Sequence, residues 1–195
     1  MKTSKEEILL SALRLFAKKG YEATSIFDLA NELQVTKGAI YKHFKNKQDI
    51  LDAIVSKMEE NDQHFAEQFI MPLHVLTLEE LEAYQKVTMT QVIDFSFAMF
   101  SYWTEDEFAS LFRKMLTIEQ YHDEKMGRLY QNYLCDGPYQ YILDIFKTME
   151  LKDYEEKALL FYGPMFSLYS LGDIDKELAK ERLQKHFQYM LERLV

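Results

Sequence analysis

The segment Val35–Lys47, VTKGAIYKHFKNK, decides how the N-terminal part of this chain folds. It places five cationic or potentially cationic side chains, a tyrosine and a glycine within thirteen positions. Thr36 is a good helix N-cap, because its hydroxyl can accept a backbone N–H of the first turn. KGAIYKHF is therefore predicted to form a short third helix. In that helix Val35, Ile40 and Phe44 face inward, and the polar side chains stay outside.

Helix signals on both sides of this segment predict a helix-turn-helix unit. The stretch at 3–19 opens with a capping box, and TSIFDLANEL has Thr24 or Ser25 as its cap. A fourth helix begins at Asn46 and ends at the Met71–Pro72 pair. Two helices joined by a short turn and supported by a first helix form a helix-turn-helix.

The remainder of the chain is predicted to be helical as well. Apolar residues make up 48% of the sequence, and only six Gly and three Pro interrupt it, which favours an all-helical protein. A capping box at 77–80 opens one helix, and further helices follow over 104–135, 138–150, 154–172 and 175–195. We predict an all-α chain with an N-terminal three-helix helix-turn-helix domain over 1–47. A long helix joins it to a helical-bundle regulatory and dimerisation domain over 48–195.

The net charge of the N-terminal part is opposite in sign to that of the rest of the chain. Through Lys47 there are nine Lys and Arg against five Asp and Glu, a net charge of +4, whereas the remainder has a net charge of −13. A polyanion is therefore attracted to the N-terminal part alone. No run of eighteen apolar residues is present, and the N-terminus, with Glu6 and Glu7, does not read as a secretion signal, so we expect a cytoplasmic protein without a membrane partner. The single cysteine, Cys135, excludes an intramolecular disulfide.

The outer face of the third helix has the composition that a reader of the DNA major groove needs. Lysines can bind phosphates, Tyr41 and His43 supply polar donors, and Gly38 and Ala39 allow the backbone to approach the base edges. Lys47 lies in the first turn of the fourth helix and can pair with a phosphate. An ordinary solvated cationic helix is the alternative.

At these residues the chain resembles a known family. GYEATSIFDLANELQVTKGAIYKHFKNKQDIL is similar to the DNA-binding domain of TetR-type bacterial transcriptional regulators, over about residues 4–52. In one departure the turn reads ELQVT, where the family often has Ala-Gly before the valine, so Gln34 must adopt the turn at some cost in strain. The resemblance implies operator contacts with the second helix, the third helix and Lys47. The DNA-binding residues expected are Thr24, Ser25, Thr36, Lys37, Gly38, Ala39, Tyr41, Lys42, His43 and Lys47.

The stretch Val92–Trp103 is apolar almost all round and rich in aromatic residues. One interpretation is a packed core with Asp94 at its wet edge. The other is the wall of a pocket for a small, largely apolar or aromatic effector, which the family resemblance favours. The candidate ligand-binding residues are Asp94, Phe95, Met99, Trp103 and Tyr162.

The last two predicted helices carry more apolar surface than one side of a small bundle can use. The resemblance implies a homodimer through a four-helix interface, which also suits palindromic operators. Burial within the single chain is the alternative. The candidate interface residues are Leu159, Met165, Phe166, Tyr169, Leu183, Phe187, Met190, Leu191 and Leu194.

The sequence offers no pattern typical of an enzyme. The five histidines are scattered, no His, Cys and Asp set has metal-ligand spacing, and no convergent acid, base or nucleophile is evident, so neither a metal nor another cofactor is expected. The predicted function is a DNA-binding transcriptional regulator, a repressor released from an inverted-repeat operator on double-stranded DNA by a small effector. The alternatives are a helix-turn-helix used for protein contacts or non-specific DNA organisation, and a helical enzyme or ligand carrier.

Overall fold

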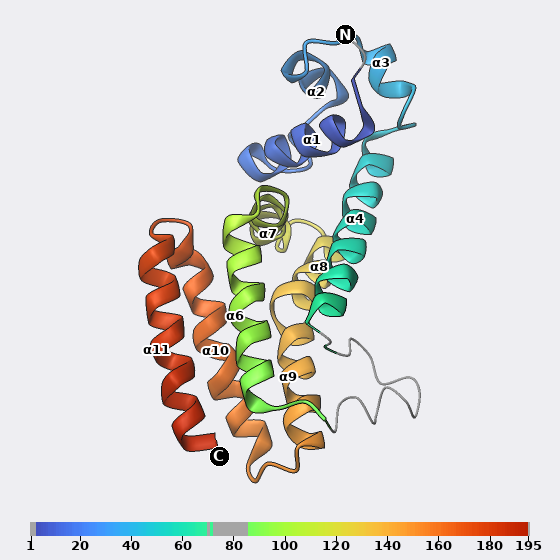
Figure 1. The fold of residues 1–195 in the computed structure, drawn as a ribbon. Helices are drawn as coiled ribbons and strands as arrows, with labels where there is room; N and C mark the ends of the chain where they lie inside the picture. Colours follow the sequence, from blue (N-terminus) through green and yellow to red (C-terminus); the bar gives the residue numbers. More distant parts are fainter. Residues whose placement is uncertain (1–2, 70, 72–85, 195) are drawn as a thin grey trace. The chain divides into compact units, whose positions relative to one another are not determined.

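The computed structural model describes residues 3–69, 71 and 86–194, and each regular element in this part of the chain is an α-helix (Figure 1). The predicted all-α class is thereby confirmed. By packing, the chain divides into two compact units. One comprises Met1–Asp62 and Glu107–Tyr130, and the other comprises Gln63–Asp106 and Gln131–Val195. The predicted division at residue 47 is a functional one and stays a prediction.

The first unit contains the helix-turn-helix and two later helices. Its elements are α1 (Lys5–Lys19), α2 (Ile26–Glu32), α3 (Lys37–Tyr41), most of α4 (Lys47–Gln68), α7 (Glu107–Glu119) and the start of α8 (Glu124–Leu134). Helix α1 packs against α2 and α7, and α2 packs against α3. Ile8, Ala12 and Phe16 of α1 are buried in this core together with Leu29 of α2.

The helix starts in this unit follow local side-chain caps. Ser4 is the N-cap of α1, and Ser25, rather than Thr24, is the N-cap of α2. Each completes a capping box with the acidic residue three positions later. Asn46 accepts the backbone N–H of Asp49 at 2.9 Å, as predicted for the start of α4.

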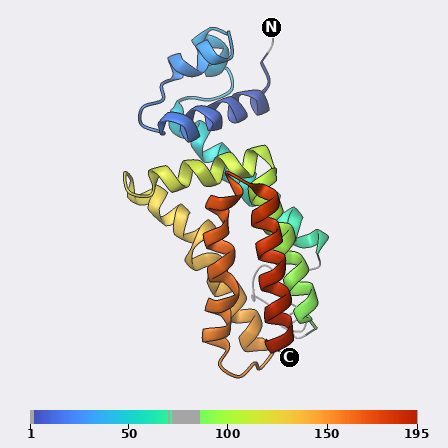
Figure 2. The same cartoon turned by 90° about the vertical axis from the view of Figure 1, so that its left-hand side faces the viewer.

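The second unit is a bundle of longer helices. It contains the end of α4, α6 (Met89–Glu105), the end of α8, α9 (Asp136–Thr148), α10 (Tyr154–Gly172) and α11 (Lys176–Leu194). Helix α10 packs against α6, α9 and α11, and α11 also packs against α6 (Figures 1 and 2). The capping box that opens α6 is formed by Thr88 and Gln91. The capping box predicted at 77–80 lies outside the described residues.

Five of the side chains predicted for a dimer interface fill the core of their own chain instead. Phe187 stacks on Phe161 with 4.8 Å between ring centroids, and Tyr169 stacks on Phe100 at 5.2 Å. None of the five is more than 6% exposed, so each packs within its own chain, and a contact with a partner chain stays a prediction. These residues are Met165, Tyr169, Leu183, Phe187 and Met190.

The other predicted interface residues differ from these five. Leu159, Phe166 and Leu191 are exposed to solvent, whereas the Leu194 side chain lies outside the described part of the structure. Within the described residues, no helix combines the length and the apolar character that crossing a membrane requires.

Candidate nucleic-acid interface

Helix α3 is short, and its cap and two apolar anchors fix its position. The Thr36 hydroxyl accepts the backbone N–H of Ala39 at 3.3 Å, which satisfies one free donor of the first turn. Ile40 is fully buried, and Phe44, just beyond the helix, is 3% exposed. Because these anchors point inward, the rest of the segment is held toward solvent.

The outer face of the segment is polar and cationic. Ala39 is partly exposed, and the other predicted contact residues of the segment are exposed: Thr36, Lys37, Gly38, Tyr41, Lys42 and His43. A Cβ added to Gly38 would have the Thr36 hydroxyl as its nearest described neighbour, at 3.7 Å, so the fold itself does not require glycine here. A bare backbone at this position suits close approach to base edges. Contact of these residues with DNA stays a prediction.

The turn between α2 and α3 takes the strained form that its sequence implies. Gln34 has a φ of 54°, the left-handed region that favours glycine. The backbone N–H of Val35 donates to the Ala30 carbonyl at 2.9 Å and closes the turn. The turn that connects α2 to α3 therefore holds Gln34 in a strained backbone conformation.

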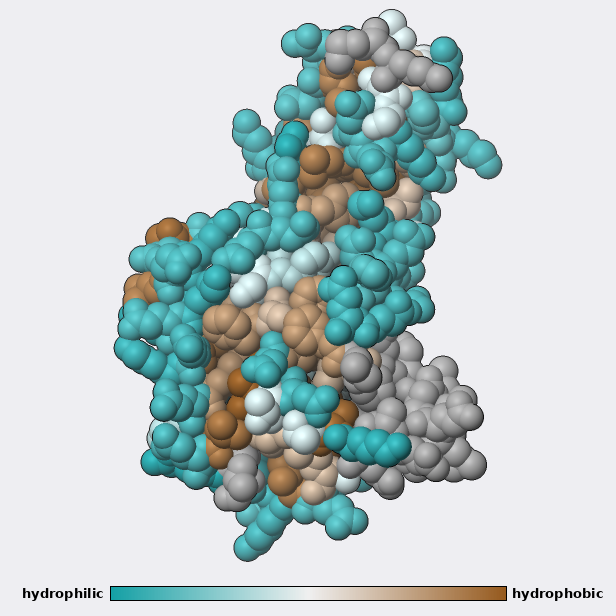
Figure 3. All heavy atoms as spheres, viewed as in Figure 1, coloured by the Kyte–Doolittle hydropathy of each residue, from teal (hydrophilic) through white to brown (hydrophobic). Residues whose placement is uncertain are grey.

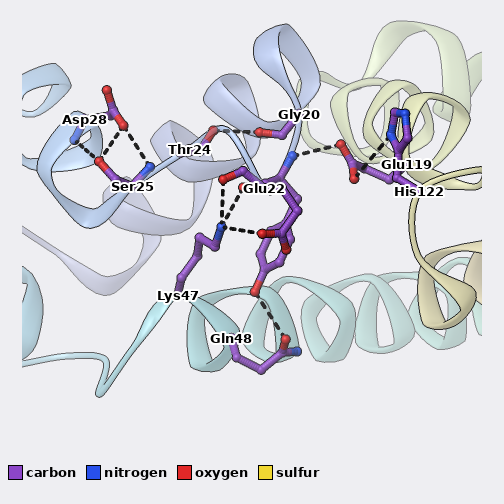
Figure 4. Close-up of polar contacts among 10 residues, drawn as sticks. Gly20, Glu22, Thr24, Ser25, Asp28, Lys47, Gln48, Glu119 and His122 are labelled. Carbon is purple, nitrogen blue, oxygen red and sulfur yellow. Dashed lines mark hydrogen bonds and ion pairs between the residues drawn. The ribbon is translucent and has the colours of Figure 1, made fainter.

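Thr24 and Ser25 play different parts at the start of α2. The Ser25 hydroxyl accepts the Asp28 backbone N–H at 3.1 Å and remains exposed. Thr24 is 3% exposed, and its hydroxyl donates to the Gly20 carbonyl at 2.8 Å (Figure 4). The Thr24 side chain is therefore engaged in the α1–α2 turn and faces away from solvent, and its contact with DNA stays a prediction.

Lys47 is bound within the protein in this structure. Its Nζ donates to the carbonyl oxygens of Tyr21 at 2.8 Å and Glu22 at 3.3 Å, and it lies 4.2 Å from the centroid of the Tyr21 ring (Figure 4). The side chain is 23% exposed. Lys47 thus ties the first turn of α4 to the α1–α2 turn, and the predicted phosphate contact must compete with these bonds.

Tyr21 forms the centre of a polar network that sequence reasoning missed. Its hydroxyl donates to Gln48 Oε1 at 3.2 Å, and its backbone N–H donates to Glu119 Oε1 at 2.9 Å. Burial, followed by the charge of Glu22, raises the pKa of the Tyr21 hydroxyl to about 12. The network joins α7 and α4 to the turn that precedes α2.

Gly20 makes room for the α7 part of this network. Its φ is 89°, and an added Cβ would lie 2.7 Å from Glu119 Oε1. Glu119 is 2% exposed, and its other oxygen lies 3.9 Å from His122 Nδ1 (Figure 4). The glycine was readable from the sequence as a helix stop, but nothing local to it indicated that the next residue, Tyr21, bonds a partner 98 residues away.

Phe27 is a second feature that the sequence analysis did not single out. It lies in the first turn of α2 and is 56% exposed, whereas most of the other large aromatic side chains in the described part are buried or partly buried. The Lys37 Nζ lies 5.0 Å from the centroid of its ring. The exposed face of α3 is therefore continuous with an aromatic side chain of α2.

The residues predicted to bind an effector do not form one group. Asp94 is exposed, because it lies about 200° around α6 from the buried Val92. This position agrees with the interpretation that places Asp94 at the wet edge of a packed core, and its role in ligand binding stays a prediction. Phe95 and Trp103 are buried on the inner side of the helix, and Met99 is partly exposed. Figure 3 shows apolar side chains gathered along α6 on the face toward the viewer.

An aromatic cluster surrounds Phe95 in the second unit. Its ring centroid lies 6.0 Å from that of Phe65, 5.7 Å from Phe69 and 5.9 Å from Tyr141. Tyr162 of α10 is fixed by a hydrogen bond of 2.7 Å from its hydroxyl to the Leu134 carbonyl. This arrangement agrees with the packed-core interpretation for Phe95, and a ligand must displace or rearrange some of these rings to bind among them.

Chemistry other than binding finds no support in the described side chains. Within residues 3–69, 71 and 86–193, no three His, Cys, Asp or Glu side chains are grouped so that they can hold a metal ion. His122 and Glu119 are 3.9 Å apart, but Glu119 already accepts a backbone N–H. The arrangement is suited to positioning a cationic surface.

Comparison with known proteins identifies the N-terminal part. Residues 8–54 match the family described as "Bacterial regulatory proteins, tetR family". An uncharacterised HTH-type transcriptional regulator of Bacillus subtilis, YvkB, is 36% identical over 89 residues, which cover 42% of this chain and 47% of YvkB. The chain spans less than half the length of the curated relatives it matches.

Solved structures show the same fold over almost the whole chain. A transcriptional regulator of the TerR/AcrR family from Aquifex aeolicus superposes with a TM-score of 0.66 at 19% identity, covering 95% of this chain and 98% of that one. SmeT of Stenotrophomonas maltophilia, in a complex with triclosan, superposes with a TM-score of 0.64 at 18% identity, covering 96% and 90%. At these identities the likeness concerns the fold alone.

Proposed function

The chain belongs to the tetR family of bacterial regulatory proteins, and on this premise we propose that it is a sequence-specific DNA-binding regulator of transcription. The observation that carries the proposal is the exposed cationic face of α3, anchored by the buried Ile40 and Phe44. The net charge of +4 through Lys47 adds a general attraction to DNA. A role as an enzyme does not agree with this family.

The proposed complex places α3 in the major groove. Lys37, Lys42 and His43 then face the DNA, and Gly38 lets the backbone come close to the base edges. The hydroxyl of Tyr41, which is 52% exposed, reaches a phosphate. Contacts to the DNA backbone position the protein, whereas contacts to base edges read the sequence. In this proposal Lys37 contacts a base edge.

The active species in this proposal is a homodimer that binds an inverted repeat. Support comes from an apolar surface on α10, here called the α10 surface, which consists of Leu159, Leu160, Gly163 and Phe166. Leu159 and Leu160 are 62% and 60% exposed, and a Cβ added to Gly163 would meet no described atom within 4 Å. At 100° per residue, positions 159, 160, 163 and 166 fall within one side of the helix, and α10 lies beside α11 in Figure 2. Two such surfaces related by a twofold axis give a closed dimer.

The regulator is further proposed to be a repressor that a small, largely apolar or aromatic effector releases from DNA. Support comes from the similarity in fold to SmeT, which is described in complex with triclosan. In this proposal the ligand enters among the rings around Phe95, which rearrange to admit it. The coupling required is modest, because a hundredfold loss of operator affinity corresponds to about 2.7 kcal/mol. Trp103 is the single tryptophan and gives a fluorescence signal for ligand binding without labelling.

The experiment that tests the function is DNase I footprinting and gel shift on the DNA upstream of the chain's own gene. We expect one protected inverted repeat, with half-sites about one helical turn apart, roughly 34–36 Å. Equal affinity for upstream and random DNA would favour non-specific DNA organisation. An absence of DNA binding would favour a helix-turn-helix used for protein contacts or a ligand carrier.

A further inference from the structure

The proposal concerns the pair formed by Phe27 on α2 and Lys37 on α3. Leu29 and Ala30 form the buried face of α2, and Phe27 lies outside this face, 56% exposed. The Lys37 ammonium lies over its ring at 5.0 Å from the centroid. More than half of the ring surface is open to solvent, and the contact that distinguishes it is the one with the Lys37 cation.

Lys37 is itself at an unusual position for a lysine. It is the first residue of α3, immediately after the Thr36 cap. The N-terminal end of a helix carries partial positive charge, so a cation there is mildly unfavourable. No acidic side chain within the described residues forms an ion pair with Lys37 at 4.0 Å or less. The negative face of an aromatic ring compensates for this placement and restricts a side chain that otherwise has many rotamers.

We propose that Phe27 is a positioning residue for DNA recognition, which holds the Lys37 ammonium in the orientation that reads the operator. The inference rests on the proposed function and adds to it a residue outside the recognition helix. Preorganisation lowers the ordering cost that Lys37 incurs on binding. Because Phe27 acts through Lys37, its contribution exists only when Lys37 is present.

A double-mutant cycle tests this dependence. Phe27→Leu removes the ring but keeps apolar bulk, Lys37→Ala removes the cation, and the double variant combines them. Affinity is measured by fluorescence anisotropy with the upstream fragment that the wild-type chain protects. Phe27→Leu should weaken binding about two- to fivefold in the wild-type background and have no measurable effect in the Lys37→Ala background. Phe27→Tyr, which keeps the ring, should bind like wild type.

The outcomes separate the possible roles. Equal losses from Phe27→Leu in both backgrounds would overturn the proposal, because they would show that Phe27 contacts DNA itself or supports the fold. Failure of Phe27→Tyr to restore affinity would overturn it as well. Thermal unfolding of each variant provides the control for folding. If the wild-type chain does not discriminate the upstream fragment from random DNA, the proposed function itself fails; if it does and the cycle shows no coupling, only the role of Phe27 fails.

Discussion

Replacing Asp62 by asparagine should change the way in which the stability of the protein depends on pH. Asp62 lies on the inner stripe of α4, four residues after the fully buried Met58. Its Oδ1 atom is buried and has no hydrogen-bond partner within the described part of the chain. Burial, followed by the nearby charge of Glu59, raises the pKa of the Asp62 carboxyl to about 7. The folded protein therefore holds a proton that an unfolded chain releases near pH 4.

The sign and size of the effect follow from this difference. Between about pH 4 and pH 7 the folded state binds more protons than the unfolded state, so the free energy of unfolding falls as the pH rises through this window. A difference of about three pKa units corresponds to at most about 4 kcal/mol, fully present below pH 4 and lost above pH 7. Because asparagine cannot ionise, the free energy of unfolding of the Asp62→Asn variant does not fall in this pH window. Its stability relative to wild type should increase by up to that amount between pH 4 and pH 8.

The assay is urea unfolding followed by circular dichroism at several pH values between 4 and 8, for both proteins. The measured quantity is the difference in unfolding free energy between Asp62→Asn and wild type at each pH. Glu60→Gln, at an exposed position on the same turn, provides the matched control and should give a nearly constant difference. A constant difference for Asp62→Asn as well, or one that decreases as the pH rises, would refute the reasoning.

Three further substitutions test the roles of particular side chains. Lys47→Met should lower the free energy of unfolding by about 1–3 kcal/mol, because two charge-assisted hydrogen bonds to the α1–α2 turn are lost. Unchanged stability, together with a slope of log DNA affinity against log salt concentration reduced by about one, would instead support the phosphate contact. Leu160→Glu should give monomers in sedimentation, whereas Ile174→Glu, at a position 87% exposed, should leave the mass unchanged; an unaltered mass for Leu160→Glu would contradict the α10 surface as the interface. Gln34→Gly should raise the urea-derived stability by about 0.5–1 kcal/mol, since the φ of 54° no longer strains the residue; a loss of stability would show that the Gln34 side chain matters more than its backbone.

The parts of the fold that the sequence predicted well are those set by neighbours a few residues apart. The caps at Ser25, Thr36 and Asn46 each involve a backbone N–H three positions later. The inward positions of Ile40 and Phe44 follow from helical spacing alone. Such signals do not depend on how distant segments pack, which is why the helix-turn-helix was readable.

For a different physical reason, the sequence could not predict which residues of α10 remain exposed in the single chain. Helix α10 is apolar around much of its circumference, so periodicity cannot say which side meets its own bundle and which side is left over. Tyr169 stacks on Phe100 inside the chain, whereas Leu160, not predicted, is 60% exposed. Composition indicated a surplus of apolar surface, but only the packing of α10 on α6, α9 and α11 shows which residues make up the surplus.

The Gly20–Glu22 turn shows why the remaining part of the site was not readable. Its backbone groups bind Glu119 of α7 and Lys47 of α4, and a helix-turn-helix sequence considered by itself has no place for α7. Backbone donors and acceptors in a buried turn must find partners. Here the side chains of Glu119 and Lys47 are these partners. From residue type alone, Glu119 is expected at the surface and Lys47 is expected to contact a phosphate. Because α2 follows directly from this turn, the position of α2, and through their packing that of α3, depends on contacts with α4 and α7 as well as on the helix-turn-helix sequence.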